Sequence, residues 1–236
     1  MEAILSLALI PVAFLLLYIY RKDRIQPEPI INLIKGIIYG IGSCFIVFAY
    51  AELVGSGDEL NGIEDAFIMA AIPEECAKLL MLWLLVRHMK EFDEPFDGIV
   101  YAVCIGMGFA GFENILYLIE NSDSLLSVGV MRGISAVPGH FSFAVAMGYY
   151  YSAVKFGSER HRTTNRVLTL VAPIILHGIY DSLLSLPEDV MGLAMIVWVV
   201  FCVCMFIYAH KRIKSMRTPP IPQAPTDENN NKNLYR

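Results

Sequence analysis

Long unbroken runs of apolar residues constrain this chain more than any other feature of its sequence. Seven of them are long enough to cross the roughly 30 Å hydrocarbon core of a bilayer at about 1.5 Å per helical residue. They cover residues 3–20, 30–54, 66–86, 98–119, 128–151, 167–186 and 190–208. Backbone groups in lipid must bond within their own segment, so each run is predicted to form a helix.

Composition agrees with an all-α, polytopic membrane protein. Of the 236 residues, 56% are apolar and 17% are charged, whereas ordinary soluble domains have about 45–50% and about 25%. The net charge of −5 argues against a nucleic-acid partner. We expect residues 1–209 to form a single membrane-embedded domain. The basic, proline- and asparagine-rich segment 210–236 is predicted to be a disordered tail.

The loops between the runs differ in charge and predict the orientation of the bundle. Thirteen Lys and Arg residues follow the first, third, fifth and seventh runs: Arg21, Lys22, Arg24, Arg87, Lys90, Lys155, Arg160, Arg162, Arg166, Lys211, Arg212, Lys214 and Arg217. The opposite loops carry only acidic residues: Asp58, Glu59, Glu64, Asp65, Asp123, Glu188 and Asp189. The positive-inside rule therefore predicts an external N-terminus and a cytoplasmic C-terminus.

Ionisable side chains within the runs need a structural or chemical reason, because each costs about 2.5–3.5 kcal/mol near the bilayer centre. This interior set consists of Glu74, Glu75, Lys78, Glu113, Arg132, His140, His177 and Asp181. Counted from the external ends of four runs, the acids and histidines lie roughly 8–18 Å below the outer surface. Their common depth predicts a shared, water-accessible cavity. Arg132 lies close to the start of its run and is interpreted as a snorkelling anchor.

The segment from Glu74 to Lys78 places a carboxylate and an ammonium four residues apart on one helix face. An ion pair between them would lower the cost of burying both. Glu75 is then left over, and a surplus buried carboxylate suits a general base. A purely structural salt bridge is the alternative interpretation of the same spacing.

The remaining interior residues form further pairs with the same spacing. Asp181 lies four residues after His177 and is placed to fix the tautomer of that imidazole. Glu113 and Tyr117 also share a helix face, and His140 follows a Pro-Gly pair that predicts a kink. Each pair has a structural alternative, since His–Asp and Glu–Tyr hydrogen bonds also occur in ordinary helix packing, and a lone histidine is often a packing residue.

These motifs together resemble the PrsW family of bacterial intramembrane proteases. Residues 74–78 match its E-E-x-x-K motif, residues 112–117 match F-E-x-x-x-Y, His140 matches the first intramembrane histidine, and residues 177–181 match H-G-x-x-D. The similarity covers roughly residues 3–208. The chain is also distantly similar to CAAX prenyl proteases and bacteriocin-immunity proteases. That wider group has a histidine in place of Tyr117, so its full ligand set cannot be carried over.

The resemblance implies a multi-pass intramembrane endopeptidase in the bacterial cell membrane. Its implied substrate is a single-pass membrane protein such as an anti-sigma factor, whose first cleavage begins the release of a stress sigma factor. The catalytic residues that it implies are Glu74, Glu75, Lys78, Glu113, His140, His177 and Asp181. A site in the outer half of the membrane predicts a cut near the external surface.

Two mechanisms are compatible with these residues. In one, His140, His177 and Glu113 bind Zn²⁺, which leaves an open position for water, and Glu74 or Glu75 is the base. In the other there is no metal: a glutamate activates water and the histidines stabilise the oxyanion. The sequence has no H-E-x-x-H zinc motif, so both stay open.

Two other classes of function compete with a protease. A proton-coupled transporter also uses buried acids and histidines, although its internal repeats are not visible in this sequence. A non-catalytic membrane scaffold is the third possibility, but it would not need so many buried titratable groups.

Overall fold

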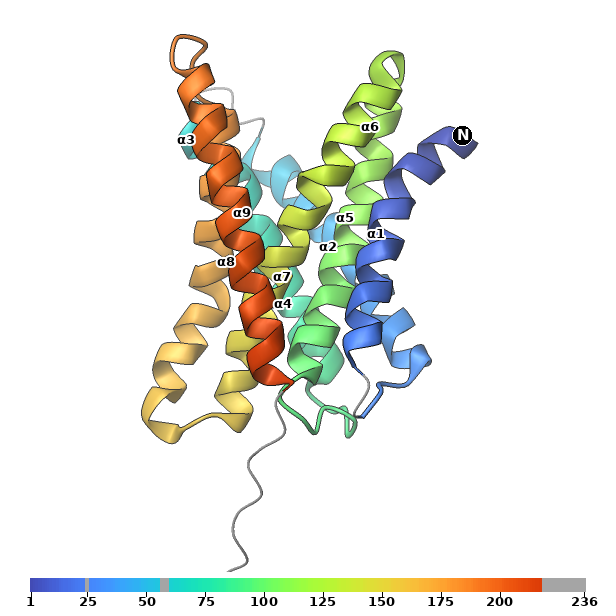
Figure 1. Ribbon diagram of the computed structural model, residues 1–236, viewed down its shortest axis with the longest axis vertical. Helices are drawn as coiled ribbons and strands as arrows, with labels where there is room; N and C mark the ends of the chain where they lie inside the picture. The colour runs from blue at the N-terminus through green and yellow to red at the C-terminus, as the bar shows by residue number, and fades with distance from the viewer. Residues whose placement is uncertain (24–25, 56–59, 218–236) are drawn as a thin grey trace, which may run out of the picture.

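The computed structural model describes residues 1–23, 26–55 and 60–217, which fold as helices joined by short connections (Figure 1). Arg24, Asp58, Glu59 and the tail from Thr218 onward lie outside the described residues. The longer helices are α1 (Glu2–Lys22), α2 (Ile30–Val54), α4 (Ile72–Val86), α5 (Asp97–Glu120), α6 (Leu125–Ile134), α7 (Ala136–Phe156), α8 (Arg162–Leu184) and α9 (Met191–Met216). The one-turn helix α3 (Gly62–Asp65) and the π-helix η1 (Ala66–Ala71) precede α4 directly.

All seven predicted runs are helical, and five helical stretches are long and apolar enough to cross a membrane. These are Glu2–Lys22, Ile30–Val54, Asp97–Glu120, Glu159–Leu184 and Met191–Met216. The other two runs are interrupted. The third changes from π-helix η1 to α4, and the fifth is divided between α6 and α7 at Ser135. The count of seven spans and their direction across the membrane stay predictions.

Helix α9 extends about two turns beyond residue 209, after which we predicted the tail to begin. We expected residues 210–236 to be disordered, but α9 continues through Met216. The side chains of Ala209 and Ile213 are buried in the main apolar core. Packing on one helix face therefore extends α9 through the basic stretch that begins the predicted tail.

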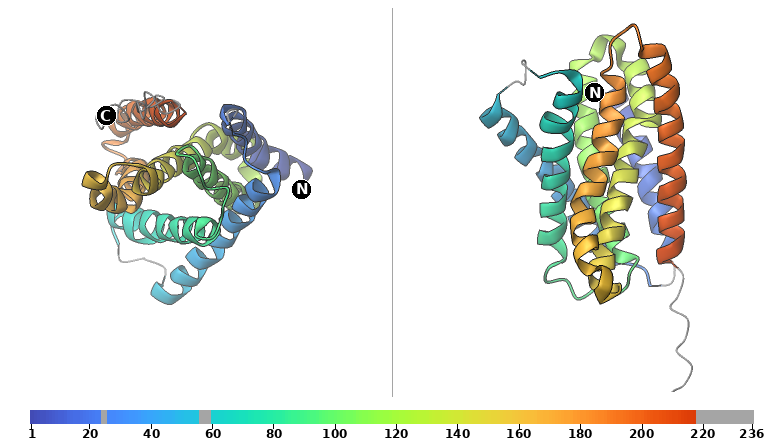
Figure 2. Two further views of the ribbon diagram at one scale, coloured as in Figure 1. Left: turned by 90° about the horizontal axis from the view of Figure 1, so that it is seen from below. Right: turned by 90° about the vertical axis from the view of Figure 1, so that its left-hand side faces the viewer.

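Helix α5 is the centre of the bundle. It packs on α1, α2 and α7, and α7 in turn packs on α8 and α9 (Figure 2). The connections with clustered basic residues gather at the lower end of the molecule in Figure 1, with the end of α9. The connections at the upper end contain Asp123, Glu188 and Asp189. The charge asymmetry in the sequence is thus an asymmetry between the two ends of the bundle.

Glycine allows the central helices to approach closely. A Cβ atom on Gly108 of α5 would lie 2.2 Å from the carbonyl oxygen of Ile37 on α2, and one on Gly40 would lie 2.1 Å from that of Ile105. A Cβ atom on Gly148 of α7 would lie 2.3 Å from the carbonyl oxygen of Gly98. Small residues at such crossings are the usual means of bringing membrane helices into contact.

The π-helix η1 places the first acidic motif. The amide of Ile72 donates to the carbonyl of Phe67, five residues earlier, and Pro73 follows in the first turn of α4, where its missing N–H is tolerated. Gly178 of α8 lets η1 pack closely, since a Cβ atom there would lie 2.2 Å from the Phe67 ring. The missing side chain of Gly178 therefore permits the close contact between α8 and η1.

We predict that Gly108→Ala destabilises the protein by about 1–3 kcal/mol, because the added methyl group meets the backbone of α2. Thermal unfolding in detergent measures the effect. Gly192→Ala on α9 is the matched control, since a Cβ atom there has no neighbour within 4 Å, and the better helix propensity of alanine makes it neutral or slightly stabilising. Equal melting temperatures for the two variants would contradict the packing argument.

Candidate active site

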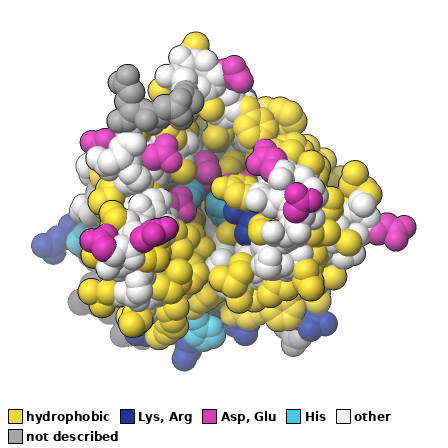
Figure 3. Space-filling model, turned by 90° about the horizontal axis from the view of Figure 1, so that it is seen from above, with side chains coloured by type: hydrophobic (Ala, Val, Ile, Leu, Met, Phe, Trp, Pro, Cys, Tyr) yellow, Lys and Arg dark blue, Asp and Glu magenta, His cyan; other side chains and the backbone are white. Residues whose placement is uncertain are grey.

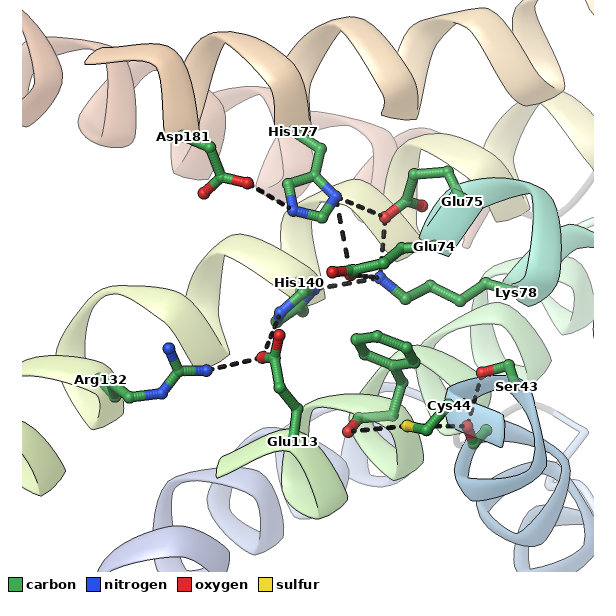
Figure 4. A network of polar contacts seen from close by, with 12 residues as sticks. Ser43, Cys44, Glu74, Glu75, Lys78, Glu113, Arg132, His140, His177 and Asp181 are labelled. Atoms are coloured by element: carbon green, nitrogen blue, oxygen red, sulfur yellow. Dashed lines mark hydrogen bonds and ion pairs between the residues drawn. The ribbon is translucent and has the colours of Figure 1, made fainter. Parts of the chain in front are cut away.

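The ammonium group of Lys78 lies at the centre of a buried polar cluster formed by residues of α4, α5, α6, α7 and α8 (Figure 4). Its Nζ atom donates to Oε2 of Glu74 at 2.9 Å and to Oε1 of Glu75 at 2.8 Å. It also lies 3.2 Å from Nδ1 of His140 on α7. Only 3% of Lys78 is exposed, and Glu75 is fully buried. The two acids and the lysine of the first motif therefore act as one unit that α7 completes.

Both histidines present Nδ1 to this centre and Nε2 to a carboxylate outside it. His177 has Nδ1 at 3.0 Å from Oε1 of Glu75 and Nε2 at 3.1 Å from Oδ2 of Asp181. His140 has Nε2 at 3.1 Å from Oε2 of Glu113. An ammonium can only donate, so Nδ1 of His140 accepts from Lys78, and the ring proton on Nε2 is donated to Glu113. Outer carboxylates of this kind orient metal-binding and catalytic imidazoles.

Arg132 on α6 supplies the second permanent cation of the site. Its Nη2 atom donates to Oε2 of Glu113 at 2.6 Å, and its Nε atom donates to Oδ1 of Asn114 at 2.6 Å. The guanidinium also covers the ring of Tyr117, with Cζ 3.7 Å from the ring centroid. The structure therefore corrects our interpretation of Arg132 as a snorkelling anchor: it is held inside the site by an acid and an amide.

Aromatic rings form the apolar boundary of the cluster. Phe109 lies under the Lys78 ammonium, with 3.9 Å between Nζ and the ring centroid. Phe143 stacks on His177, with 4.7 Å between the ring centroids. A cation over a desolvated ring gains about 2 kcal/mol. These rings therefore hold Lys78 and His177 in place on the sides where no polar partner stands.

A cavity of about 470 Å³ leads to this cluster. Its charged and imidazole lining includes Arg132 and five of the predicted residues, together with Asp65: Asp65, Glu74, Glu113, Arg132, His140, His177 and Asp181. The upper face of the molecule is hollowed above it, and His, basic and acidic side chains are visible within the hollow (Figure 3). The cavity opens at the end of the bundle that we predict to be external, so water has a route to the buried groups.

The structure brings together all seven residues proposed as catalytic from the sequence, but it pairs them differently. Glu75 faces the same ammonium and imidazole as Glu74 and is not left over. Glu113 pairs with His140 and Arg132, and the structural alternative had been a hydrogen bond to Tyr117. Spacing along one helix could predict the Glu74–Lys78 and His177–Asp181 contacts, but not the contacts between helices.

Sequence reasoning missed Arg132, Asn114 and Phe109 as parts of the site. The signal for Arg132 was present: the loops at the external end contain no Lys or Arg, so a lone arginine near that end needs an acidic partner. Asn114 and Phe109 had no such signal, because both residue types are common on packed helix faces.

The donor set at the centre fits a metal ion. Glu74, Glu75, His140 and His177 each offer one ligand atom, and these atoms lie within 4.8 Å of one another. Two imidazole nitrogens with carboxylate oxygens are ligands typical of zinc, and the outer carboxylates Glu113 and Asp181 support such imidazoles. Glu113, which we had placed in the metal set, therefore lies behind His140. The Lys78 ammonium contacts three of the four donors, which shows that the group accommodates positive charge.

Comparison with known proteins identifies the family. Residues 28–209 match the family model described as PrsW family intramembrane metalloprotease. The chain belongs to the PrsW family. It is 34% identical to Protease PrsW of Clostridioides difficile over 82% of this chain and 84% of that protein. It is 33% identical to Protease PrsW of Geobacillus kaustophilus over 95% of this chain and 96% of that protein. No solved structure matches the chain.

Membership in the PrsW family decides between the classes of function that the sequence left open. The chain is a peptide hydrolase and not a transporter or scaffold, and as an intramembrane protease it acts on a membrane protein within the bilayer. Its apolar helices are those of a multi-pass membrane protein.

We predict that Lys78→Met lowers the free energy of unfolding by about 3–5 kcal/mol, because it leaves two buried carboxylates without their cation. Thermal unfolding in detergent measures the loss. The triple variant Glu74→Gln/Glu75→Gln/Lys78→Met removes the uncompensated charge and recovers most of the stability. Lys90→Met, at an exposed lysine, is the matched control. A melting temperature for Lys78→Met equal to that of Lys90→Met would contradict the central role of this ion pair.

Proposed function

We propose that the polar cluster is the active site of the protease and that Glu74 is its general base. The observation that supports this is the position of the cluster at the inner end of a cavity open to one end of the bundle. Glu74 lines the cavity, whereas Glu75 is fully buried beside it. A carboxylate must reach the water from which it takes a proton, so Glu74 has the access that a base needs. Glu75 then positions Lys78 and His177.

Arg132 is the proposed donor to the oxyanion that forms when water attacks the peptide carbonyl. It lines the cavity, and its guanidinium has five N–H donors, of which those on Nε and Nη2 bond Asn114 and Glu113. His177 is held by Asp181 and faces the carboxylates of α4, so in the metal-free mechanism it is placed to pass the proton taken up by Glu74 to the leaving amine.

A metal ion would be held by His140, His177 and Glu75, with Glu74 left free to act as the base, and the family description favours zinc over the metal-free mechanism. Bound zinc supplies a Lewis acid for the peptide carbonyl and lowers the pKa of a water ligand to about 7. Glu113 and Asp181 would then keep the two imidazoles in the tautomer that leaves Nδ1 available.

The proposed substrate is a single-pass anti-sigma factor in the bacterial cell membrane, cut near the external surface as the first step of sigma-factor release. The cavity opens at the end of the bundle that lacks basic loops, which the positive-inside rule assigns to the exterior. We further propose that residues 1–209 contain the whole protease domain.

Co-expression of the chain with candidate single-pass anti-sigma factors tests this function directly. The wild-type chain is expected to shorten the substrate, and Glu74→Gln to lower the rate by about 10²–10⁴-fold, the usual contribution of a general base. Glu75→Gln and His177→Ala are expected to abolish cleavage by disturbing the same unit. Immunoblots of the membrane fraction measure the cleavage of the substrate and the amount of protease present.

Glu91→Gln is the matched control for this series, because Glu91 is an exposed acid at the other end of the bundle. It should leave cleavage unchanged. Normal processing by Glu74→Gln, Glu75→Gln and His177→Ala together would overturn the site assignment.

Elemental analysis tests whether the protein binds zinc at this site. We expect about one zinc per purified chain, loss of zinc in His140→Ala/His177→Ala, and retention in His88→Ala, which changes an exposed histidine outside the site. Chelators should inactivate the enzyme and added zinc should restore it. Fully active protein with less than about 0.1 zinc per chain would establish the metal-free mechanism in its place.

A further inference from the structure

The active-site cavity adjoins a groove between α6 and α9. The groove has a volume of about 200 Å³, and its walls include Met131, Ile134 and Ser135 on one side and Trp198, Val199 and Val203 on the other. Three of these residues, Met131, Ser135 and Trp198, also line the active-site cavity. The two spaces are therefore adjacent, and these three residues lie between the active site and the side of the bundle.

Helices α6 and α9 form this opening because they do not pack extensively on each other. Within the described residues, which include both helices completely, α6 packs on α1, α5 and α7, while α9 packs on α7 and α8. Their upper halves diverge in Figure 1. Because neither helix covers the facing side of the other, the gap between α6 and α9 is the natural place for a third helix to enter.

The walls of the groove suit an apolar helix. Ile134 is 66% exposed, Val203 is 52% exposed and Val199 is 49% exposed. A single residue of α6, Gly129, is buried. At membrane depth these side chains contact lipid in the free protein, and a substrate helix can replace that lipid without loss of polar contacts.

The indole N–H of Trp198 lies at the inner end of the groove, where it meets the active-site cavity. Only 8% of Trp198 is exposed, and its Nε1 atom has no hydrogen-bond partner among the described residues. An unpaired buried N–H group costs about 1–3 kcal/mol. A substrate segment that unwinds for cleavage exposes backbone carbonyls that must find new donors inside the membrane. Trp198 stands where such a segment would leave the groove and enter the cavity.

The larger cavity of the molecule is a poorer route to the site. It has a volume of about 650 Å³, lies between α4, α7 and α8, and includes Cys76, Trp83 and Arg87 among its walls. It shares no described lining residue with the active-site cavity. A segment bound there would remain separated from Glu74 by α4 itself.

We propose that the transmembrane helix of the protein substrate enters between α6 and α9, and that Trp198 donates its indole N–H to a backbone carbonyl of the unwound segment. The inference rests on the proposed protease function. A membrane-anchored helix cannot reach an enclosed site through the external mouth, because its own apolar length stays in the bilayer. Lateral entry between two helices that are not packed together resolves this problem.

Site-specific crosslinking tests the entry route. A photocrosslinking amino acid replaces Val203 in the groove or, as matched control, Val200, which is 57% exposed on the same helix but does not line the groove. The Glu74→Gln chain serves as background so that the substrate stays intact. The probe is the single-pass anti-sigma factor that the wild-type chain cleaves in co-expression. We expect crosslinks within the transmembrane segment of this probe from position 203 and few from position 200.

The results separate the two proposals. Cleavage by the wild type with equal crosslinking from positions 203 and 200, or with crosslinks to lipid alone from position 203, would overturn the entry route and leave the protease function standing. Absence of cleavage of every candidate by the wild type would overturn the proposed substrate class, and the entry route with it.

The two tryptophans of the chain provide a test of the donor. Trp198→Phe keeps an aromatic ring but removes the N–H, and we expect it to lower kcat/KM for the same probe by about 2- to 12-fold, the value of one hydrogen bond. Trp83→Phe is the matched control, because Trp83 lines the other cavity, and it should cleave at the wild-type rate. Equal kcat/KM values for the two variants, with equal melting temperatures, would refute the role of Trp198.

Discussion

The need to neutralise charge inside an apolar bundle is the constraint on which this structure depends. Lys78 is 3% exposed and Glu75 is not exposed at all, and an isolated charge at such a position would be costly by several kcal/mol. The ion pairs of Lys78 with Glu74 and Glu75, and of Arg132 with Glu113, make burial tolerable. The Arg132–Glu113 pair also joins α6 to α5. The contacts of Lys78 with His140 and of Glu75 with His177 join α4 to α7 and α8, so the same charged groups help to place these helices around the cavity.

Backbone irregularities allow the helices to meet at this point. The π-helix η1 and Pro73 lead into the acidic motif, and the break at Ser135 separates the helix that carries Arg132 from the helix that carries His140. These are the two places where the expected long spans are interrupted. Freed backbone groups are tolerated at membrane depth only where protein or a hydrated cavity surrounds them, and both interruptions border the cavity.

The polar cluster is shielded from lipid on one side and accessible to water on another. Phe109 and Phe143 close the apolar side of the cluster, while the cavity above Glu74 leads to one end of the bundle. A hydrolase in a membrane needs both, since water must reach the scissile bond and the substrate must come from the bilayer. The groove between α6 and α9 supplies the second requirement from a different direction, so water and substrate need not share one entrance.

The sequence by itself determined the helical class, the seven apolar segments, the charge difference between the ends, and which ionisable residues lie inside the bundle, because hydropathy and i,i+4 spacing are local properties. It also predicted the contacts of Glu74 with Lys78 and of His177 with Asp181, which lie within single helices. Only the tertiary structure decided that Glu113 stands behind His140, that Arg132 belongs to the site, and that Glu75 is buried while Glu74 faces the cavity. These contacts join residues from separate helices, and no pattern along one helix encodes how another helix is rotated against it.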